Sequence, residues 1–149
     1  HPQAHTVLSA YRMGARLARA NAEASVERLY GEPVRSEAGL DTAVRLLASS
    51  RRLGLAAMAL EAGVYHARPV AAAVQQVRAF TEHVEATLGV LAESLRGTSA
   101  RLDHLPDLRA DQIALKDANT QDGTLIISQS DQITNAVNTM TELTAKLRL

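Results

Sequence analysis

The sequence predicts an all-α protein, an antiparallel bundle of four long helices plus one short helix. Apolar residues recur in steps of three and four along most of the 149-residue chain, which is the spacing of one helix face. Leu and Ala dominate, and only 3% of the residues are aromatic, which favours helices packed through aliphatic side chains over a β-sandwich or barrel. Short connections between the periodic stretches favour antiparallel neighbours. We expect residues 1–149 to form a single domain.

The first predicted helix covers residues 4–30. One face carries apolar and small side chains, at Tyr11, Ala15, Ala18, Ala22, Val26 and Leu29. We expect this face to be a buried seam, because its alanines allow a partner helix to approach closely. Gly31 and Pro33 end the helix, since glycine accepts the left-handed C-terminal conformation and proline cannot continue the hydrogen-bond ladder.

Two polar features of this helix are not explained by packing alone. Asn21, with Ser25 and Arg28 on the next turns, lies near the small-residue seam, where an amide needs a partner and can fix the register between helices. A second stripe beside the apolar one is basic: Arg12, Arg16 and Arg19. A charged row at the border of a core is usually a solvated flank, and that is the default interpretation.

The same periodicity predicts the next two helices. The second covers residues 37–66, with Ser36 as its N-cap. From Leu53 to Val64 it is apolar almost all round, as expected in the middle of a bundle. The third begins at Pro69, a favourable first-turn residue, and carries a heptad stripe to Leu95.

A polar link over residues 97–105 is the longest break in the pattern. Pro106 then begins the short helix, residues 119–123 form a turn, and the last long helix covers residues 124–148. Apolar residues recur at heptad spacing along this last helix. It also carries a polar stripe: Thr124, Ser128, Asp131, Asn135, Asn138 and Glu142.

Composition and motifs exclude several kinds of chemistry. The 16 basic and 16 acidic residues balance, so the chain has no net positive charge that would attract nucleic acid. Cysteine is absent, which excludes thiolate chemistry. His1 and His5 have the i,i+4 spacing of metal ligands on a helix, but Pro2 and the chain end oppose a formed helix there. No second histidine at ligand spacing accompanies His83, and we expect it to be a solvated helix residue. No serine-triad motif or phosphate-binding glycine loop occurs. We therefore expect no enzyme activity, no cofactor, no metal and no nucleic-acid partner.

Four stretches of the chain resemble the C-terminal soluble domain of the fusaric acid resistance family, bacterial inner-membrane proteins associated with export of aromatic carboxylic acids. They are residues 15–29 with Glu32-Pro33, Arg51-Arg52-Leu53, Leu105-Pro106-Asp107-Leu108-Arg109, and residues 130–140. The stretches follow the order of the family and are distributed along nearly the whole chain. Gln132 departs from the pattern, because the family carries arginine directly after the aspartate that Asp131 matches.

The resemblance implies a domain on the cytoplasmic face of the bacterial inner membrane, excised from a multi-pass efflux transporter. Its role would be structural, in oligomerisation, or in coupling, and the substrate path would lie in membrane spans outside this chain. The implied partners are the transmembrane part of the same polypeptide, further copies in a homo-oligomer, and a periplasmic adaptor reached through the parent protein. No stretch of this chain approaches the roughly 20 apolar residues of a transmembrane helix.

Two sets of site residues follow from this interpretation. We expect one interhelical polar contact between the first and last helices, formed by Asn21, Ser25, Arg28, Asp131, Asn135 and Asn138. We expect a membrane-proximal basic stripe, formed by Arg12, Arg16 and Arg19, because positive charge marks the cytoplasmic side of a span.

The same heptads also fit a stand-alone helical interaction module, such as an adaptor or the dimerisation bundle of a sensor. The two interpretations differ upstream of His1. Hydrophobic spans in the reading frame favour the exporter, whereas a start codon near His1 favours the module.

Overall fold

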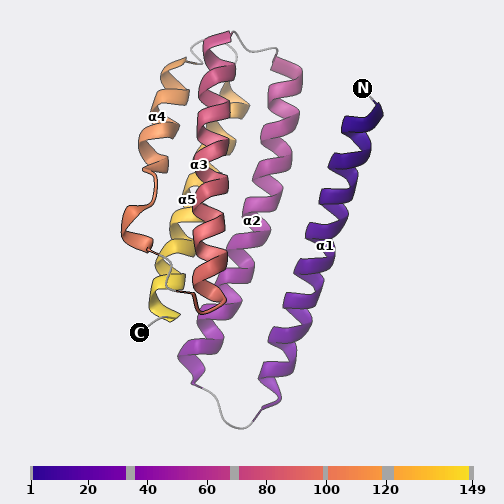
Figure 1. Cartoon of the computed structure of the whole chain (residues 1–149), viewed down its shortest axis with the longest axis vertical. Helices are drawn as coiled ribbons and strands as arrows, with labels where there is room; N and C mark the ends of the chain where they lie inside the picture. Colours follow the sequence, from indigo (N-terminus) through magenta and orange to yellow (C-terminus); the bar gives the residue numbers. More distant parts are fainter. Residues whose placement is uncertain (1, 33–35, 68–70, 99–100, 119–122, 148–149) are drawn as a thin grey trace. The chain divides into compact units, whose positions relative to one another are not determined.

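The structure is a computed structural model, and it is all-α, as predicted (Figure 1). It describes residues 2–32, 36–67, 71–98, 101–118 and 123–147, with the backbone alone at residues 2–8 and 67. These ranges contain no strand. The helices are α1 (Pro2–Tyr30), α2 (Glu37–Ala67), α3 (Ala71–Leu95), α4 (Leu108–Ala118) and α5 (Thr124–Leu147), with a short 3-10 helix, η1 (Leu102–His104), before α4.

The predicted ends of the helices differ from those of the structure by no more than two residues. Ser36 caps α2, because its Oγ accepts a hydrogen bond from the Gly39 amide at 3.2 Å. Gly97 follows α3 with a φ of 85°, a left-handed conformation that glycine adopts without steric cost. The predicted breaks at Pro33 and Pro69 lie outside the described residues.

Two compact units make up the chain, residues 1–47 and residues 48–149. The first contains α1 and the N-terminal part of α2. None of the side chains described in α1, residues 9–30, is buried. The predicted seam of α1 is partly buried at Ala22, Val26 and Leu29, but Tyr11 is 75% exposed. The prediction of a buried seam is therefore wrong at its N-terminal end, because a unit with only two helical segments covers little of either one.

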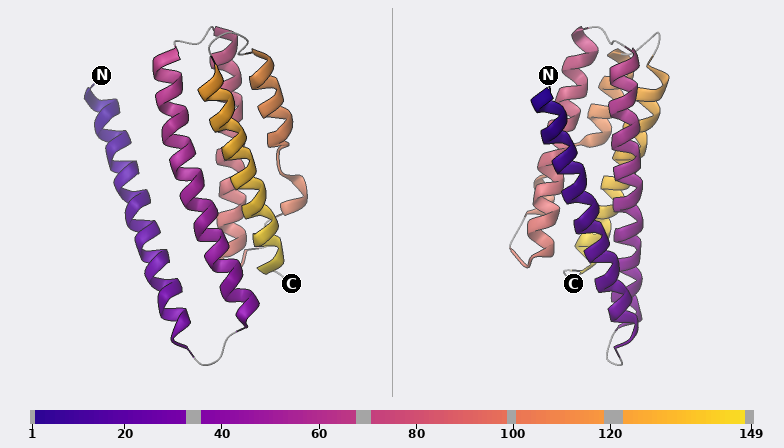
Figure 2. Two further views of the ribbon diagram at one scale, coloured as in Figure 1. Left: turned by 180° about the vertical axis from the view of Figure 1, so that it is seen from behind. Right: turned by 90° about the vertical axis from the view of Figure 1, so that its right-hand side faces the viewer.

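The second unit contains the hydrophobic core. Its helices α3, α4 and α5 pack against one another and lie side by side in both views of Figure 2. The C-terminal part of α2 also contributes to this core. The buried core residues are Ala56, Leu60, Phe80, Leu108, Leu115, Ile126, Ile133 and Val137. Because α2 buries only one face here, the prediction that Leu53 to Val64 is enclosed all round is wrong for Leu55 and Met58, which are exposed.

Helix α2 approaches α5 closely at Gly63, which is buried. A Cβ atom at this position would lie 3.2 Å from the side chain of Leu125 and 3.5 Å from Ile126. Glycine in a helix interior costs up to about 1 kcal/mol relative to alanine. At Gly63 the close packing of two helices offsets that cost.

We predict that Gly63→Leu lowers the free energy of unfolding by about 1–3 kcal/mol, because the added side chain overfills the contact with Leu125. The matched control is Gly89→Leu in α3, where a Cβ atom meets nothing within 4 Å. That change should raise the free energy of unfolding by up to about 1 kcal/mol through helix propensity. Urea unfolding followed by circular dichroism measures both. Equal effects at the two positions would contradict the close approach.

Candidate functional site

A polar cluster joins α4 to α5, and we call it the Arg109 junction; its members are Arg109, Asp131 and Asn135. Arg109 Nη1 donates to Asp131 Oδ1 at 2.5 Å, and Arg109 Nη2 donates to Asn135 Oδ1 at 2.5 Å. Asn135 Nδ2 in turn donates to Asp131 Oδ2 at 3.1 Å. Asp131 and Asn135 are four residues apart and therefore share one face of α5. The three side chains form a closed network in which each contacts the other two.

The start of α4 places the guanidinium. Asp107 Oδ1 accepts hydrogen bonds from the amides of Arg109 and Ala110, at 3.0 and 3.1 Å, which is the pattern of an N-cap. Leu108, the first residue of α4, is 2% exposed and fixed in the core. A buried leucine and a capped first turn thus hold the adjacent Arg109 in one orientation toward α5.

Solvent still reaches the Arg109 junction. The side chains of Arg109 and Asp131 are 41% and 46% exposed. Ion pairs at this exposure are screened by water and contribute little to stability, typically 0–1 kcal/mol. The arrangement is suited to setting the alignment of α4 against α5. A guanidinium stays protonated in proteins, so this cluster offers no general base or acid at Arg109.

A second polar contact connects α4 to α3. His83 Nδ1 lies 2.6 Å from Asp111 Oδ2, and their side chains are 48% and 22% exposed. His83 is an exposed helix residue, as predicted, but it also contacts Asp111, which was not predicted. Its sequence neighbours gave no sign of this, because its partner lies 28 positions along the chain on another helix.

One carboxylate near the start of α4 has a perturbed proton affinity. Arg101 Nη2 donates to Asp103 Oδ2 at 3.1 Å, and this hydrogen bond is the main reason that the pKa of Asp103 lies below its ordinary value. A backbone hydrogen bond and nearby His104 act in the same direction. The side chain of Asp103 is 62% exposed on η1, so the shift reflects a surface ion pair.

The structure brings together part of the predicted interhelical set. Asp131 and Asn135 lie in the Arg109 junction, and Asn138 is exposed one turn further along α5. In α1, Ser25 Oγ donates to the carbonyl oxygen of Asn21 at 2.8 Å, and Arg28 Nη2 donates to Ser25 Oγ at 3.1 Å. The predicted contact between these two groups joins the two units of the chain, and it stays a prediction.

Arg109 was not among the predicted site residues. A usable signal was nevertheless present. Asp131 and Asn135 form an acid–amide pair outside the heptad seam of the last helix, and such a pair can accept both arms of a guanidinium. Arg109 directly follows a core leucine near the start of a short helix, which makes it the kind of donor that packing can orient.

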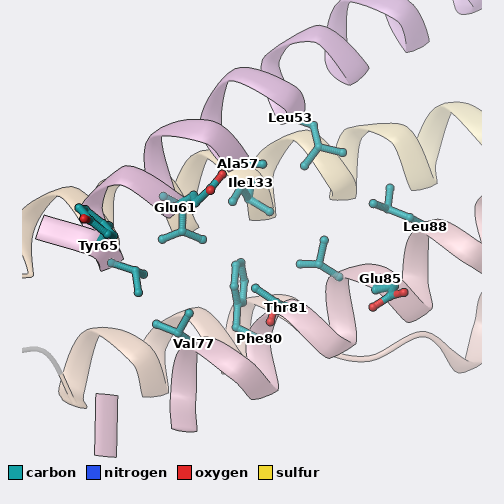
Figure 3. Close-up of a pocket in the computed structure, with 13 residues that line it drawn as sticks. Leu53, Ala57, Glu61, Tyr65, Val77, Phe80, Thr81, Glu85, Leu88 and Ile133 are labelled. Carbon is teal, nitrogen blue, oxygen red and sulfur yellow. The ribbon is translucent and has the colours of Figure 1, made fainter. Parts of the chain in front are cut away.

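An open apolar groove of about 730 Å³ lies between α2 and α3, with Ile133 of α5 at its base (Figure 3). We call it the α2–α3 groove. Helix α2 contributes Leu53, Ala57, Leu60, Glu61, Val64 and Tyr65. Helix α3 contributes Val77, Phe80, Thr81, Val84, Glu85 and Leu88. All of these residues belong to the second unit.

Within the described ranges, no group of three or more His, Asp or Glu side chains is arranged to hold a metal ion. The same ranges contain no helix with the length and apolar character needed to span a bilayer. Comparisons with protein-family models, with curated proteins and with solved structures found no significant match.

We predict that Arg109 and Asp131 are energetically coupled. In a double-mutant cycle of Arg109→Ala and Asp131→Ala, urea unfolding should give a coupling energy of about 0.5–1 kcal/mol that decreases with added salt. The control cycle uses Arg78 and Glu82, an i,i+4 pair within α3 that is more exposed, at 80% and 61%. It should give about 0.3–0.5 kcal/mol. A coupling near zero for Arg109 and Asp131 would contradict an aligning role.

Proposed function

We propose that the chain is the cytoplasmic domain of an inner-membrane efflux transporter that resembles the fusaric acid resistance family, and that its role is structural. The observation that carries this proposal is the Arg109 junction. It links Arg109 of the Leu105–Arg109 stretch to Asp131 and Asn135 of the 130–140 stretch. These two stretches carry much of the resemblance, and their polar residues are engaged with each other in aligning two helices.

In this role the domain supports self-association of the membrane parts or couples them, and it has no catalytic activity, cofactor or metal of its own. The partners are the transmembrane part of the same polypeptide, further copies of the chain, and a periplasmic adaptor reached through the parent protein. The transported substrate would be an aromatic or related organic acid, handled in membrane spans outside this chain.

We also propose that the helices complete an antiparallel bundle of four long helices plus the short α4. The long helices have similar lengths, with 29, 31, 25 and 24 residues in α1, α2, α3 and α5, so each can run along the others. In that bundle the Asn21–Ser25–Arg28 group of α1 would contact the Asp131–Asn138 edge of α5. The short polar chain within α1 supports this, because it links Asn21 through Ser25 to Arg28, two turns further along the same face of the helix.

The basic stripe of α1 has a place in the same proposal. Arg12 and Arg16 are exposed, and Arg19 is partly exposed one turn later. If a membrane span precedes α1, these residues lie close to the bilayer. Each basic residue near an anionic surface contributes about 1 kcal/mol to binding. The stripe would then hold the start of α1 against anionic headgroups.

We predict that the chain binds vesicles of phosphatidylcholine and phosphatidylglycerol, and that replacing Arg12, Arg16 and Arg19 with glutamine weakens this binding at least tenfold. Vesicle co-sedimentation measures the change. The matched control replaces three exposed arginines of the second unit, Arg78, Arg96 and Arg101, with glutamine and so removes the same charge. An equal loss in both triple variants would show a general effect of charge and would contradict a localised stripe.

The alternative is a stand-alone helical interaction or dimerisation module. It is favoured by the exposed apolar side chains of α1, since Tyr11, Met13 and Leu17 are 63–75% exposed. Met13 and Leu17 are four residues apart and share one face of α1, and exposed apolar side chains that adjoin in this way favour a protein contact.

The reading frame upstream of His1 separates the two functions, and we predict that it encodes several hydrophobic spans. Where it does, deleting the codons for residues 1–149 from the parent gene should lower the tolerance of the host to aromatic carboxylic acids, measured as growth against acid concentration. The control deletion strain carries the intact parent gene on a plasmid. A start codon close to His1 with no preceding span would exclude the exporter and leave the interaction module.

A further inference from the structure

We propose that α1 lies along the surface of an anionic lipid bilayer and inserts Met13 and Leu17 between the headgroups. The inference rests on the proposed function, in which the basic stripe of α1 adjoins a membrane, and it adds an apolar contact that attraction to headgroups does not require. We call the side of α1 that makes this contact the outer face. Its residues, all exposed, are Ala10, Met13, Leu17 and Ala20.

The outer face of α1 is one continuous side of the helix. Its residues follow one another in steps of three and four, and Met13 and Leu17 are 69% and 63% exposed. Val26, nine residues and therefore about two and a half turns after Leu17, lies on the opposite side and is partly buried. The helix thus buries part of one side and keeps two large apolar side chains in solvent on the other.

Charges of one sign adjoin the outer face. Residues 2–22 contain three arginines and no aspartate or glutamate, although the whole chain has no net charge. Arg16 lies three positions after Met13, and Arg19 lies three positions after Arg16, so both lie on the same flank of the outer face. A helix with an apolar face and a basic flank, and without acidic residues to repel phosphate, is suited to the interface of an anionic bilayer. A contact with a second protein needs no such exclusion of acidic side chains.

The length of the basic stripe determines how α1 meets the bilayer. In a helix that stands upright, residue 19 lies about 10 Å further from the bilayer than residue 12, because each residue adds about 1.5 Å. Attraction to headgroups is screened over about 8 Å at physiological salt, so an upright helix would leave Arg19 largely beyond its range. A helix that lies along the surface instead brings the whole stripe to the headgroups. The side chains of Met13 and Leu17 then enter the apolar boundary, while the arginine stems extend along it.

The first test measures the surroundings of residue 17. The chain contains no tryptophan, so the fluorescence of Leu17→Trp reports on that position alone. We expect its emission to shift to shorter wavelength with vesicles of phosphatidylcholine and phosphatidylglycerol, to be quenched by brominated acyl chains, and not to shift with phosphatidylcholine alone. The matched control is Tyr30→Trp, at a similarly exposed position of α1 (65%) that follows Glu23 and Glu27. Its emission should not change.

The second test measures the contribution of the apolar side chains to binding. Met13→Gln with Leu17→Gln keeps every charge of α1, and it should weaken binding to the same anionic vesicles about tenfold, because two apolar side chains no longer leave water. The matched control replaces an exposed leucine and an exposed methionine of α2, Leu55→Gln with Met58→Gln, and should leave binding unchanged. Vesicle co-sedimentation measures both, and circular dichroism should show the same helix content in each variant.

Three results would overturn the proposal. The first is vesicle binding without a shift in the emission of Leu17→Trp; the arginines would then hold headgroups while the outer face stays in water, and the proposed function would stand without insertion. The second is equal loss of binding in the α1 and α2 double variants. The third is absence of vesicle binding, and a dimer in sedimentation that Met13→Gln with Leu17→Gln disrupts would then assign the outer face to a second copy of the chain. A start codon close to His1 would instead remove the transporter proposal and leave these measurements to decide insertion.

Discussion

The burial of Leu108 and Leu115 against α3 and α5 is the interaction on which the second unit depends. Helix α4 has 11 residues, and isolated helices shorter than about 12–15 residues are marginal in water. It is therefore helical because its two leucines, 2% and 0% exposed, join the core around Phe80. Everything that α4 positions, including the guanidinium of Arg109, follows from this anchoring.

The polar contacts of α4 add orientation to a helix that its buried leucines already hold in place. Arg109 contacts α5, and Asp111, two residues later and on a different face, contacts His83 of α3. Successive residues of an α-helix are turned by about 100°, so residues 109 and 111 point to opposite neighbours. The apolar burial supplies most of the stabilisation, since exposed ion pairs add little. The polar pairs instead restrict how α4 can rotate or slide between the two long helices.

Much of the fold could be predicted from periodicity, and the exceptions have physical causes. Heptads identified α3 and α5, and turn residues such as Ser36 and Gly97 placed the helix ends well. Burial was harder to predict, because a helix face that looks like a seam is buried only if another element covers it. Tyr11 and Leu55 have the right spacing for a core but lie on faces that their own units leave open.

The candidate sites also differ in how far they could be predicted from the sequence. Asp131 and Asn135 could be identified from the sequence as polar residues that need a partner. Their partner Arg109 could not be identified, because it depends on the rotation of α4 about its axis, which the buried Leu108 sets. The α2–α3 groove was hidden for a different reason. Its residues are ordinary core residues in the sequence, and only the arrangement of α2 and α3 leaves them facing an open space.

The contrast between the two sites has a common physical origin. At the Arg109 junction, opposite charges are already paired within one chain, so the polar groups are satisfied and have little to offer a further ligand. In the α2–α3 groove, apolar side chains of two helices line an open space, and such a surface is stabilised when apolar atoms cover it. The Arg109 junction therefore aligns two helices through charges that are paired within the chain, whereas the groove keeps apolar surface that its own helices leave open.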